Sequence, residues 1–376
     1  MRKRLWLSLC AVLLLCTGCW DKAELENRGF IVSLGIDKAS DDAEDTAYDL
    51  TMTLPNIAAI AGKDGAEGET RTLLHAQADT LAAAMRMADA QTGQTLYYGH
   101  TKIAVFGANV LSDEILFKQA ADALGRNNEL SQKLIILATE DSAAKVLDAK
   151  SPNEPLIGTF VSNFYKNSAD DLHVTVRADL EQLLLQLNTT GDIIIPRISI
   201  EDDEIRLSGA AVVKDAALAG WLNEAETRGL LWLRGEGVGT ILTAHLPSPT
   251  AEKPLHVPFR TLRNRRTLSF HESADGLVCR LTLRATGSIE ELTVSPDMLI
   301  SDDILHILSQ KFEAEITREA AQTFALFQTE YGVDAADFLR TLYKQNPGLY
   351  RKYVQDPEDA FRQMTLEADV HVTIVR

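Results

Sequence analysis

Cys19 is the residue whose position most clearly indicates chemistry, because it stands where an apolar run ends and a polar, acidic sequence begins. The chain ahead of it has a basic start at residues 2–4 and an apolar stretch at residues 5–15. These are the parts of a secretory signal. The apolar stretch is shorter than the roughly 20 residues that a membrane-spanning helix needs. We therefore expect residues 1–18 to be a signal peptide and the thiol of Cys19 to be the modified group.

The sequence "LLCTGCWD" around Cys19 resembles a bacterial lipobox, in which diacylglycerol alkylates the cysteine thiol and the cysteine becomes the first mature residue. Thr17 and Gly18 match the small residues of that motif, and Cys16 stands where Leu is usual. Two acyl chains, at about 0.8 kcal/mol per buried CH₂, would hold the protein on a bilayer with its body on the exported side. Ordinary cleavage and an uncleaved anchor are the alternatives.

The remaining candidates for chemistry form no catalytic or metal-binding pattern. The eight histidines are scattered, and the sequence contains no HExxH, CxxC or GxSxG motif. The glycine-rich stretch at residues 234–240 follows an apolar helix pattern and places Glu236 where an anion would bind, so we interpret it as a turn. Cys279 lies in an alternating strand pattern that predicts a buried, inert thiol. We expect no enzymatic activity, metal or cofactor.

The charge balance limits the kinds of partner. The chain of 376 residues has a formal net charge of −17, which disfavours nucleic acid and an anionic membrane surface as partners. One basic cluster stands out, formed by Arg260, Arg263, Arg265 and Arg266. We interpret it as the solvated edge of a β-meander, where charges discourage edge-to-edge pairing. A patch that contacts lipid headgroups or an acidic partner is the alternative.

The elements that must position these residues alternate between strands and helices in the first half of the chain. Period-two and buried patterns predict strands at residues 28–37, 46–55, 100–107, 132–140 and 191–200. Helical patterns occur at residues 79–93, 112–126, 141–150 and 179–187, and Asp79 or Thr80 is the N-cap of the first. This alternation is typical of an α/β layer structure.

The second half predicts an antiparallel meander with helices. A strand pair at residues 205–222 leads into a helix at residues 223–233, and three meander strands follow at 255–262, 265–272 and 276–287. A long helix spans about residues 303–328, with Leu308, Phe312, Ile316, Ala320, Thr323 and Phe327 at helical spacing. The chain ends in an alternating strand at residues 365–375.

Together these patterns predict an α+β protein of about three domains, with mixed or antiparallel sheets packed with helices. The prolines Pro152, Pro155 and Pro196, and the change in the strand and helix patterns around them, suggest where one domain ends and the next begins. We place the signal peptide at residues 1–18, an N-terminal α/β domain at 19–148, a small middle domain at 149–203 and a C-terminal α+β domain at 204–376.

The sequence "GCWDKAELENRGFIVSLGID" resembles the opening of the Ger(x)C family, the lipoprotein subunits of spore nutrient germinant receptors. The matching residues are Cys19, Trp20, Asp21, Glu24, Leu25, Gly35, Ile36 and Asp37. A second block, "LYYGHTKIAVFG", matches at Gly99 and His100, and Tyr98 stands where the family has Trp. A third block, "GWLNEAETRGLLWLRG", matches at Gly220, Trp221, Leu222, Asn223, Glu226, Gly229 and Trp232. The resemblance covers nearly the whole mature chain.

The resemblance implies three α+β domains, no enzymatic activity, and assembly with a polytopic subunit and a permease-like subunit in the inner membrane of the spore. It makes Cys19 the lipidation site. Trp20, Asp21, His100, Trp221 and Asn223 become candidates for structural or partner-contact roles. We expect Trp221, which enters a helix after a glycine, to be largely buried.

Two other functions share part of this pattern. A solute-binding lipoprotein of a transporter would have the same anchor, and it would form two similar lobes around a polar, aromatic-lined cleft. A surface-anchored hydrolase would require a catalytic constellation that the sequence does not contain.

Overall fold

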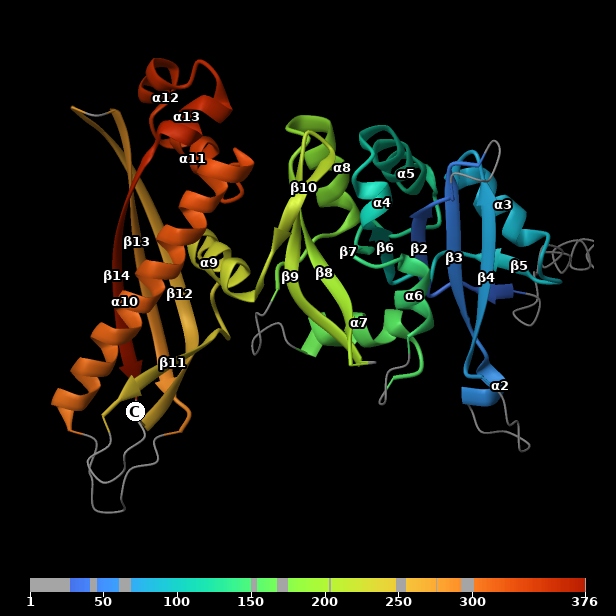
Figure 1. Ribbon diagram of the computed structural model, residues 1–376, viewed down its shortest axis with the longest axis horizontal. Coiled ribbons are helices and arrows are strands. Elements are labelled where there is room, and N and C mark those ends of the chain that lie inside the picture. Colours follow the sequence, from blue (N-terminus) through green and yellow to red (C-terminus); the bar gives the residue numbers. More distant parts are fainter. Residues whose placement is uncertain are drawn as a thin grey trace, which may run out of the picture.

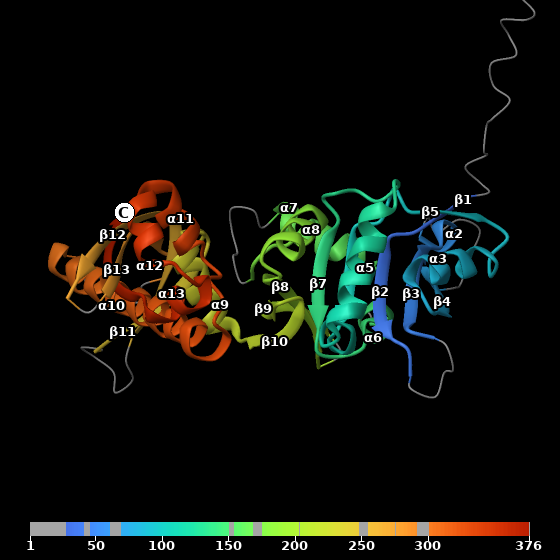
Figure 2. The same ribbon diagram turned by 90° about the horizontal axis from the view of Figure 1, so that it is seen from above.

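Three β-sheets with packed helices make up the described part of the chain, from the N-terminal strands at one end to the C-terminal sheet at the other (Figures 1 and 2). The structure is a computed structural model, and it describes residues 28–40, 46–60, 69–149, 154–167, 175–202, 204–247, 255–274, 276–291 and 301–375. The expected α+β class, with mixed sheets packed with helices, is confirmed. None of the helices in these residues is both long enough and apolar enough to cross a bilayer.

The largest sheet has eight strands in the order β10-β9-β8-β7-β6-β2-β3-β4. Their bounds are β2 (Ser33–Lys38), β3 (Tyr48–Pro55), β4 (Arg71–Ala78), β6 (Ile103–Gly107), β7 (Ile135–Thr139), β8 (Ile193–Glu201), β9 (Glu204–Lys214) and β10 (Ala217–Leu222). The central strands β2, β6, β7 and β8 pair in parallel, and the outer pairs are antiparallel. Beside this sheet, β1 (Arg28–Phe30) pairs in parallel with β5 (Thr95–Tyr97).

The central strands are buried on both faces, which explains their continuous apolar sequences. On β6, Phe106 packs into one apolar cluster and Val105 into another. Helices cover both sides, with α3 (Leu81–Asp89), α5 (Glu114–Arg126) and α8 (Leu180–Thr189) in the first cluster and α6 (Ala143–Asp148) and α7 (Ile157–Asn167) in the second. The short helices α2 (Ile57–Ile60) and α4 (Ala108–Leu111) complete this part.

Side-chain caps fix where these helices begin. The hydroxyl of Thr80 accepts a hydrogen bond from the backbone N–H of Ala83 at 3.2 Å, so Thr80 is the N-cap of α3. Asp179 and Gln182 form a capping box at the start of α8. The helix starts expected near these residues are therefore confirmed.

The C-terminal sheet has the order β11-β12-β13-β14. Its strands are β11 (Ile241–Leu246), β12 (Leu255–Ser273), β13 (Gly276–Ile289) and β14 (Thr365–Val375). The first three are antiparallel, and β14 joins β13 in parallel. The helices of this part are α9 (Glu224–Arg234), α10 (Asp302–Leu326), which continues into the π-helical turn η3 (Phe327–Tyr331), α11 (Phe338–Gln345), α12 (Pro347–Tyr353) and α13 (Pro357–Gln363).

The long helix α10 runs along this sheet (Figure 1), and its apolar stripe belongs to the same buried core as the inner face of the sheet. All six residues predicted for the stripe, from Leu308 to Phe327, are buried. Phe312 stacks on Phe259 of β12 with 4.6 Å between ring centroids. The predicted helix and its buried face are confirmed.

The prediction of separate strands at residues 255–262 and 265–272 is wrong, because both belong to the single strand β12. The register shifts between Thr261 and Arg263, so Leu262 is an extra residue in a β-bulge. The intervening "RN" contains no glycine or proline that would favour a turn. Strand β12 therefore pairs with β13 on both sides of residues 263–264 without ending there.

The predicted division into domains stays a prediction. The boundary after residue 203 falls in the turn between β8 and β9, whose strands pair from Ile193 to Glu201. The boundary after residue 148 lies at the end of α6. In the described residues, strands β7 and β8 share one register pair, Ala138 with Arg197. The pairing between these two strands is therefore the shortest in the eight-stranded sheet.

Candidate functional site

The predicted site residues that the structure describes lie in two separate places. Cys19, Trp20 and Asp21 fall outside the described residues, so lipidation stays a prediction. His100 follows β5 near the N-terminal end of the described chain, whereas Trp221 and Asn223 lie at the junction of β10 and α9. The structure therefore does not bring His100 together with the other two residues.

His100 is the exposed member of an aromatic cluster whose other rings are partly buried. Its ring lies 4.9 Å from the ring of Phe30 on β1 and 5.6 Å from that of Tyr97 on β5, measured between centroids. The guanidinium of Arg28 lies 5.3 Å from the centroid of the Tyr97 ring. The cluster holds the small β1–β5 sheet together at the point where the described chain begins, and the ring of His100 remains open to solvent. Both a structural role and a contact role fit this position.

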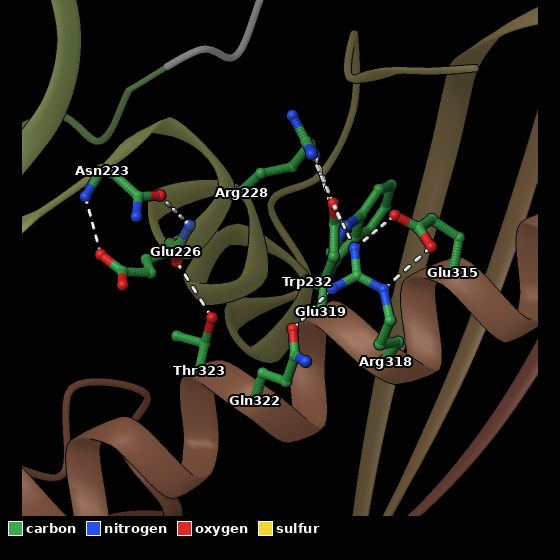
Figure 3. Close-up of polar contacts among 9 residues, drawn as sticks. All are labelled: Asn223, Glu226, Arg228, Trp232, Glu315, Arg318, Glu319, Gln322 and Thr323. Carbon is green, nitrogen blue, oxygen red and sulfur yellow. Dashed lines mark hydrogen bonds and ion pairs between the residues drawn. The ribbon is translucent and has the colours of Figure 1, made fainter.

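Asn223 has a defined structural role as the N-cap of α9 (Figure 3). Its side-chain oxygen accepts from the backbone N–H of Glu226 at 3.0 Å, and the Glu226 carboxylate accepts from the backbone N–H of Asn223 at 2.8 Å. Trp221, two residues earlier, is half-buried against the core of the large sheet. Most of the side chain is covered, as expected, and the rest stays open because β10 is the outermost strand of its sheet. The structural role of Trp221 stays a prediction.

A buried charged cluster joins α9 to α10, and the sequence analysis missed it (Figure 3). The carboxylate of Glu319 on α10 is 1% exposed. Its two oxygens accept from Nε of Arg228 at 3.0 Å each, and Oε2 accepts from Nε1 of the fully buried Trp232 at 3.0 Å. Hydrogen bonding to Glu319 raises the pKa of Arg228. Both oxygens of the buried carboxylate thus accept hydrogen bonds from side chains of α9.

Next to this cluster, α9 and α10 approach each other closely at Gly229 and Thr323. A side chain at Gly229 would place its Cβ 2.0 Å from Oγ1 of Thr323 and 2.7 Å from the carbonyl oxygen of Glu319. Thr323 in turn donates to the carbonyl of Glu226 at 3.3 Å. Only glycine permits this approach. The sequence did carry a signal for the cluster, since Glu319 continues the apolar stripe three residues after Ile316, where a charge needs a buried partner.

The basic cluster of the sequence analysis divides into different roles. The guanidinium of Arg266 turns inward and donates to the carbonyls of Leu233 at 2.6 Å and Ala336 at 2.9 Å, and burial lowers its pKa. Arg260 forms an ion pair with Glu290 at 3.3 Å. Arg263 and Arg265 remain exposed on β12.

Two other interpretations of the sequence are confirmed. Cys279 is buried, and desolvation raises the pKa of its thiol to about 12, so it is an inert thiol. The glycine-rich stretch is a turn, because Gly235 ends α9 in the left-handed conformation with φ of 77°. Among the residues that the structure describes, no group of three or more His, Cys, Asp or Glu side chains could hold a metal ion.

A groove of about 570 Å³ lies between α3 and α5. Its floor includes Tyr48 and Tyr98, whose hydroxyls already donate to the backbone carbonyls of Leu116 and Met85. It lies on one side of the large sheet, within a single layer of helices. The solute-binding alternative instead expects a cleft between two similar lobes.

Comparisons with known proteins agree across both halves of the chain. The model described as "Spore germination protein N-terminal domain" matches residues 21–200, and "Spore germination B3/ GerAC like, C-terminal" matches residues 208–376. The spore germination protein YndF of Bacillus subtilis (strain 168) is 24% identical over 403 residues, covering 97% of this chain and 94% of that protein. Spore germination protein B3 of the same organism is 20% identical over 371 residues, with 97% and 95% covered.

A solved structure has the same fold. The crystal structure of the GerBC protein superposes with a TM-score of 0.60 at 17% identity, covering 91% of this chain and 97% of that chain. This likeness supports the fold, and the two family models carry the assignment. The resemblance noted in the sequence is therefore confirmed, and the chain belongs to the GerAC family of spore germination proteins, the C subunits of germinant receptors.

Proposed function

We propose that this chain is a non-enzymatic lipoprotein subunit of a spore nutrient germinant receptor. In this proposal it couples the other receptor subunits during germination, from the outer face of the inner spore membrane. The observation that carries the proposal is the match of two germination-protein models in succession, over residues 21–200 and 208–376. The curated relatives YndF and B3 are matched over almost their whole length, so the similarity is not that of one shared module.

The anchor is the thiol of Cys19, for which the leader sequence is the support. The described chain begins at Arg28, nine residues after Cys19. At no more than about 3.6 Å per residue, β1 would start within about 30 Å of the lipid. The partly exposed aromatic cluster of Phe30, Tyr97 and His100 then lies at the membrane-proximal end of the protein.

The partners in this proposal are a polytopic subunit and a permease-like subunit of the same receptor. Tethering by the lipid confines the protein to the membrane surface and makes its association with membrane proteins effectively intramolecular. Individually weak contacts are then sufficient for assembly. The α9–α10 cluster around Glu319 supports such a role by holding the C-terminal helices against each other in one arrangement.

Deletion of residues 20–376 in spores tests the proposal. We expect loss of the response to the nutrients detected by the receptor to which this chain belongs, with normal responses through other receptors. Germination triggered downstream of the receptors should also survive. Normal responses to every nutrient, combined with loss of uptake of one solute during growth, would instead support the solute-binding alternative, for which the groove between α3 and α5 would be the site to test.

A further inference from the structure

The outer face of the C-terminal sheet is exposed and polar. Successive residues of a strand point to opposite faces, and on β13 the residues Leu281 and Leu283 point inward to the core shared with α10. The register places a different set on the outer face of the last three strands. That set is Arg263, Arg265, Thr267 and Ser269 on β12, Arg280, Thr282, Arg284 and Thr286 on β13, and Glu367, Asp369, His371 and Thr373 on β14.

Strand pairing assembles a line of basic side chains on this face. Arg265 of β12 lies directly opposite Arg284 of β13, and Arg284 lies beside His371 of β14. Arg263 is the next outward-pointing residue on β12. All four are exposed, and Nε2 of His371 lies 3.3 Å from the carboxylate of Asp369 on the same strand. We call these residues the basic row; they come from three strands, and only Arg263 and Arg265 are neighbours in the sequence.

The three arginines of the basic row are not neutralised within the part of the chain that the structure describes. No carboxylate of that part lies within 4.0 Å of the guanidinium nitrogens of Arg263, Arg265 or Arg284. On the same face, Arg280 does have such a partner, the carboxylate of Glu367 at 2.8 Å. Like charges directly opposite each other destabilise a strand pair. The stability of the sheet therefore does not explain why Arg265 faces Arg284.

We infer that the basic row is a docking site for an acidic segment of a partner protein. Guanidinium groups bind carboxylates through two parallel hydrogen bonds, so adjacent arginines suit closely spaced Asp and Glu side chains. The protein as a whole carries a charge of −17, which repels an extended anionic bilayer. A short acidic segment meets only the local positive field, so we favour a protein partner over a lipid surface. The inference rests on the proposed function only for the expectation that this partner is a receptor subunit.

Site-directed crosslinking of the full chain in spore membranes tests the inference. Thr267 is exposed and follows Arg265 on the same face, so Thr267→Cys can carry a thiol-reactive benzophenone. The buried thiol of Cys279 will not compete for the reagent. We expect a crosslinked peptide rich in Asp and Glu. Charge reversal in R265E/R284E should reduce the yield by about tenfold, because each exposed ion pair contributes a factor of up to about five.

A matched control separates the local effect from net charge. K311E/R351E changes the total charge equally, at two exposed residues on α10 and α12 away from this face, and should crosslink like the parent. The neutral variant R265T/R284T should lose crosslinking, while its melting midpoint stays the same or rises because the like-charge contact is gone. Melting curves of all variants show that a lost crosslink is not a folding defect.

The outcomes are separable from those of the proposed function. A crosslink to lipid or to a segment without acidic residues would overturn the inference, as would undiminished crosslinking in R265E/R284E. If receptor subunits co-purify with the chain but Thr267→Cys gives no crosslink, the docking site is wrong and the proposed function stands. If the crosslinked acidic segment belongs to a protein outside the receptor, the docking site stands and the expectation that its partner is a receptor subunit is wrong. The deletion of residues 20–376 tests the proposed function separately.

Discussion

Removing the buried carboxylate of Glu319 is expected to loosen the contact between α9 and α10. Glu319→Ala leaves the guanidinium of Arg228, whose side chain is 23% exposed, without its buried partner. It also leaves Nε1 of Trp232 unpaired in the core. Breaking a buried ion pair by removing one member typically destabilises a protein by about 3–5 kcal/mol. An unsatisfied buried donor alone accounts for about 1–3 kcal/mol of this.

Urea unfolding followed by tryptophan fluorescence measures the effect, because Trp232 lies in the affected core. With a slope of about 3 kcal/mol per M urea, a loss of about 3–5 kcal/mol lowers the midpoint of the Trp232 transition by more than about 1 M. Glu319→Gln keeps one acceptor and the shape of the side chain. Glu319→Gln should therefore lower the free energy of unfolding by less than Glu319→Ala does, by about 1–3 kcal/mol.

Glu315→Ala is the matched control for this prediction. Glu315 lies one turn earlier on α10, and its partner Arg318 is about half exposed, so its removal should change the free energy of unfolding by less than about 1 kcal/mol. Equal effects of Glu319→Ala and Glu315→Ala would refute the reasoning, because burial would then contribute nothing. An unchanged midpoint in Glu319→Ala would show that water or rearrangement satisfies Arg228 and Trp232.

Three further predictions concern the anchor, the pH dependence and helix packing. Cys19→Ala should move the protein from the membrane to the soluble fraction, and mass spectrometry of the wild-type N-terminal peptide should find diacylglycerol; an unmodified peptide would contradict the anchor. Burial raises the pKa of Asp334 from 3.8 to about 6, so the folded state binds more protons than the unfolded state between these values. The free energy of unfolding should therefore fall, by up to about 3 kcal/mol, as the pH rises from 4 to 7, and Asp334→Asn should remove this part of the pH dependence in urea titrations. Gly229→Ala, whose Cβ would lie 2.0 Å from Thr323, should lower the melting temperature although alanine favours helices, and an unchanged melting temperature would show that α9 can move away.

Local features of the structure could be predicted because their causes are local. The stripe from Leu308 to Phe327 specifies a helix with one apolar face, and all six of its residues are buried. The sequence "NEAE" begins a helix because Asn223 and Glu226 cap each other. Thr80 acts in the same way at α3.

Features that depend on how distant strands and helices pair could not be predicted from the sequence. The basic row exists because β12 pairs antiparallel with β13 while β14 returns in parallel, and the last 11-residue strand could have joined either edge. The Arg228–Glu319 contact joins residues 91 positions apart. The break predicted within β12 is wrong because the bulge at Leu262 lets the strand continue its pairing with β13 on both sides.

The coupling role is tested most directly by purifying the full chain from detergent-solubilised spore membranes and identifying what accompanies it. The account predicts that a polytopic subunit and a permease-like subunit co-purify in fixed proportion to the chain, and that Cys19→Ala lowers their recovery because the tether is lost. Recovery of the chain alone, or with the ATP-hydrolysing subunit of a solute transporter in place of these two, would contradict it.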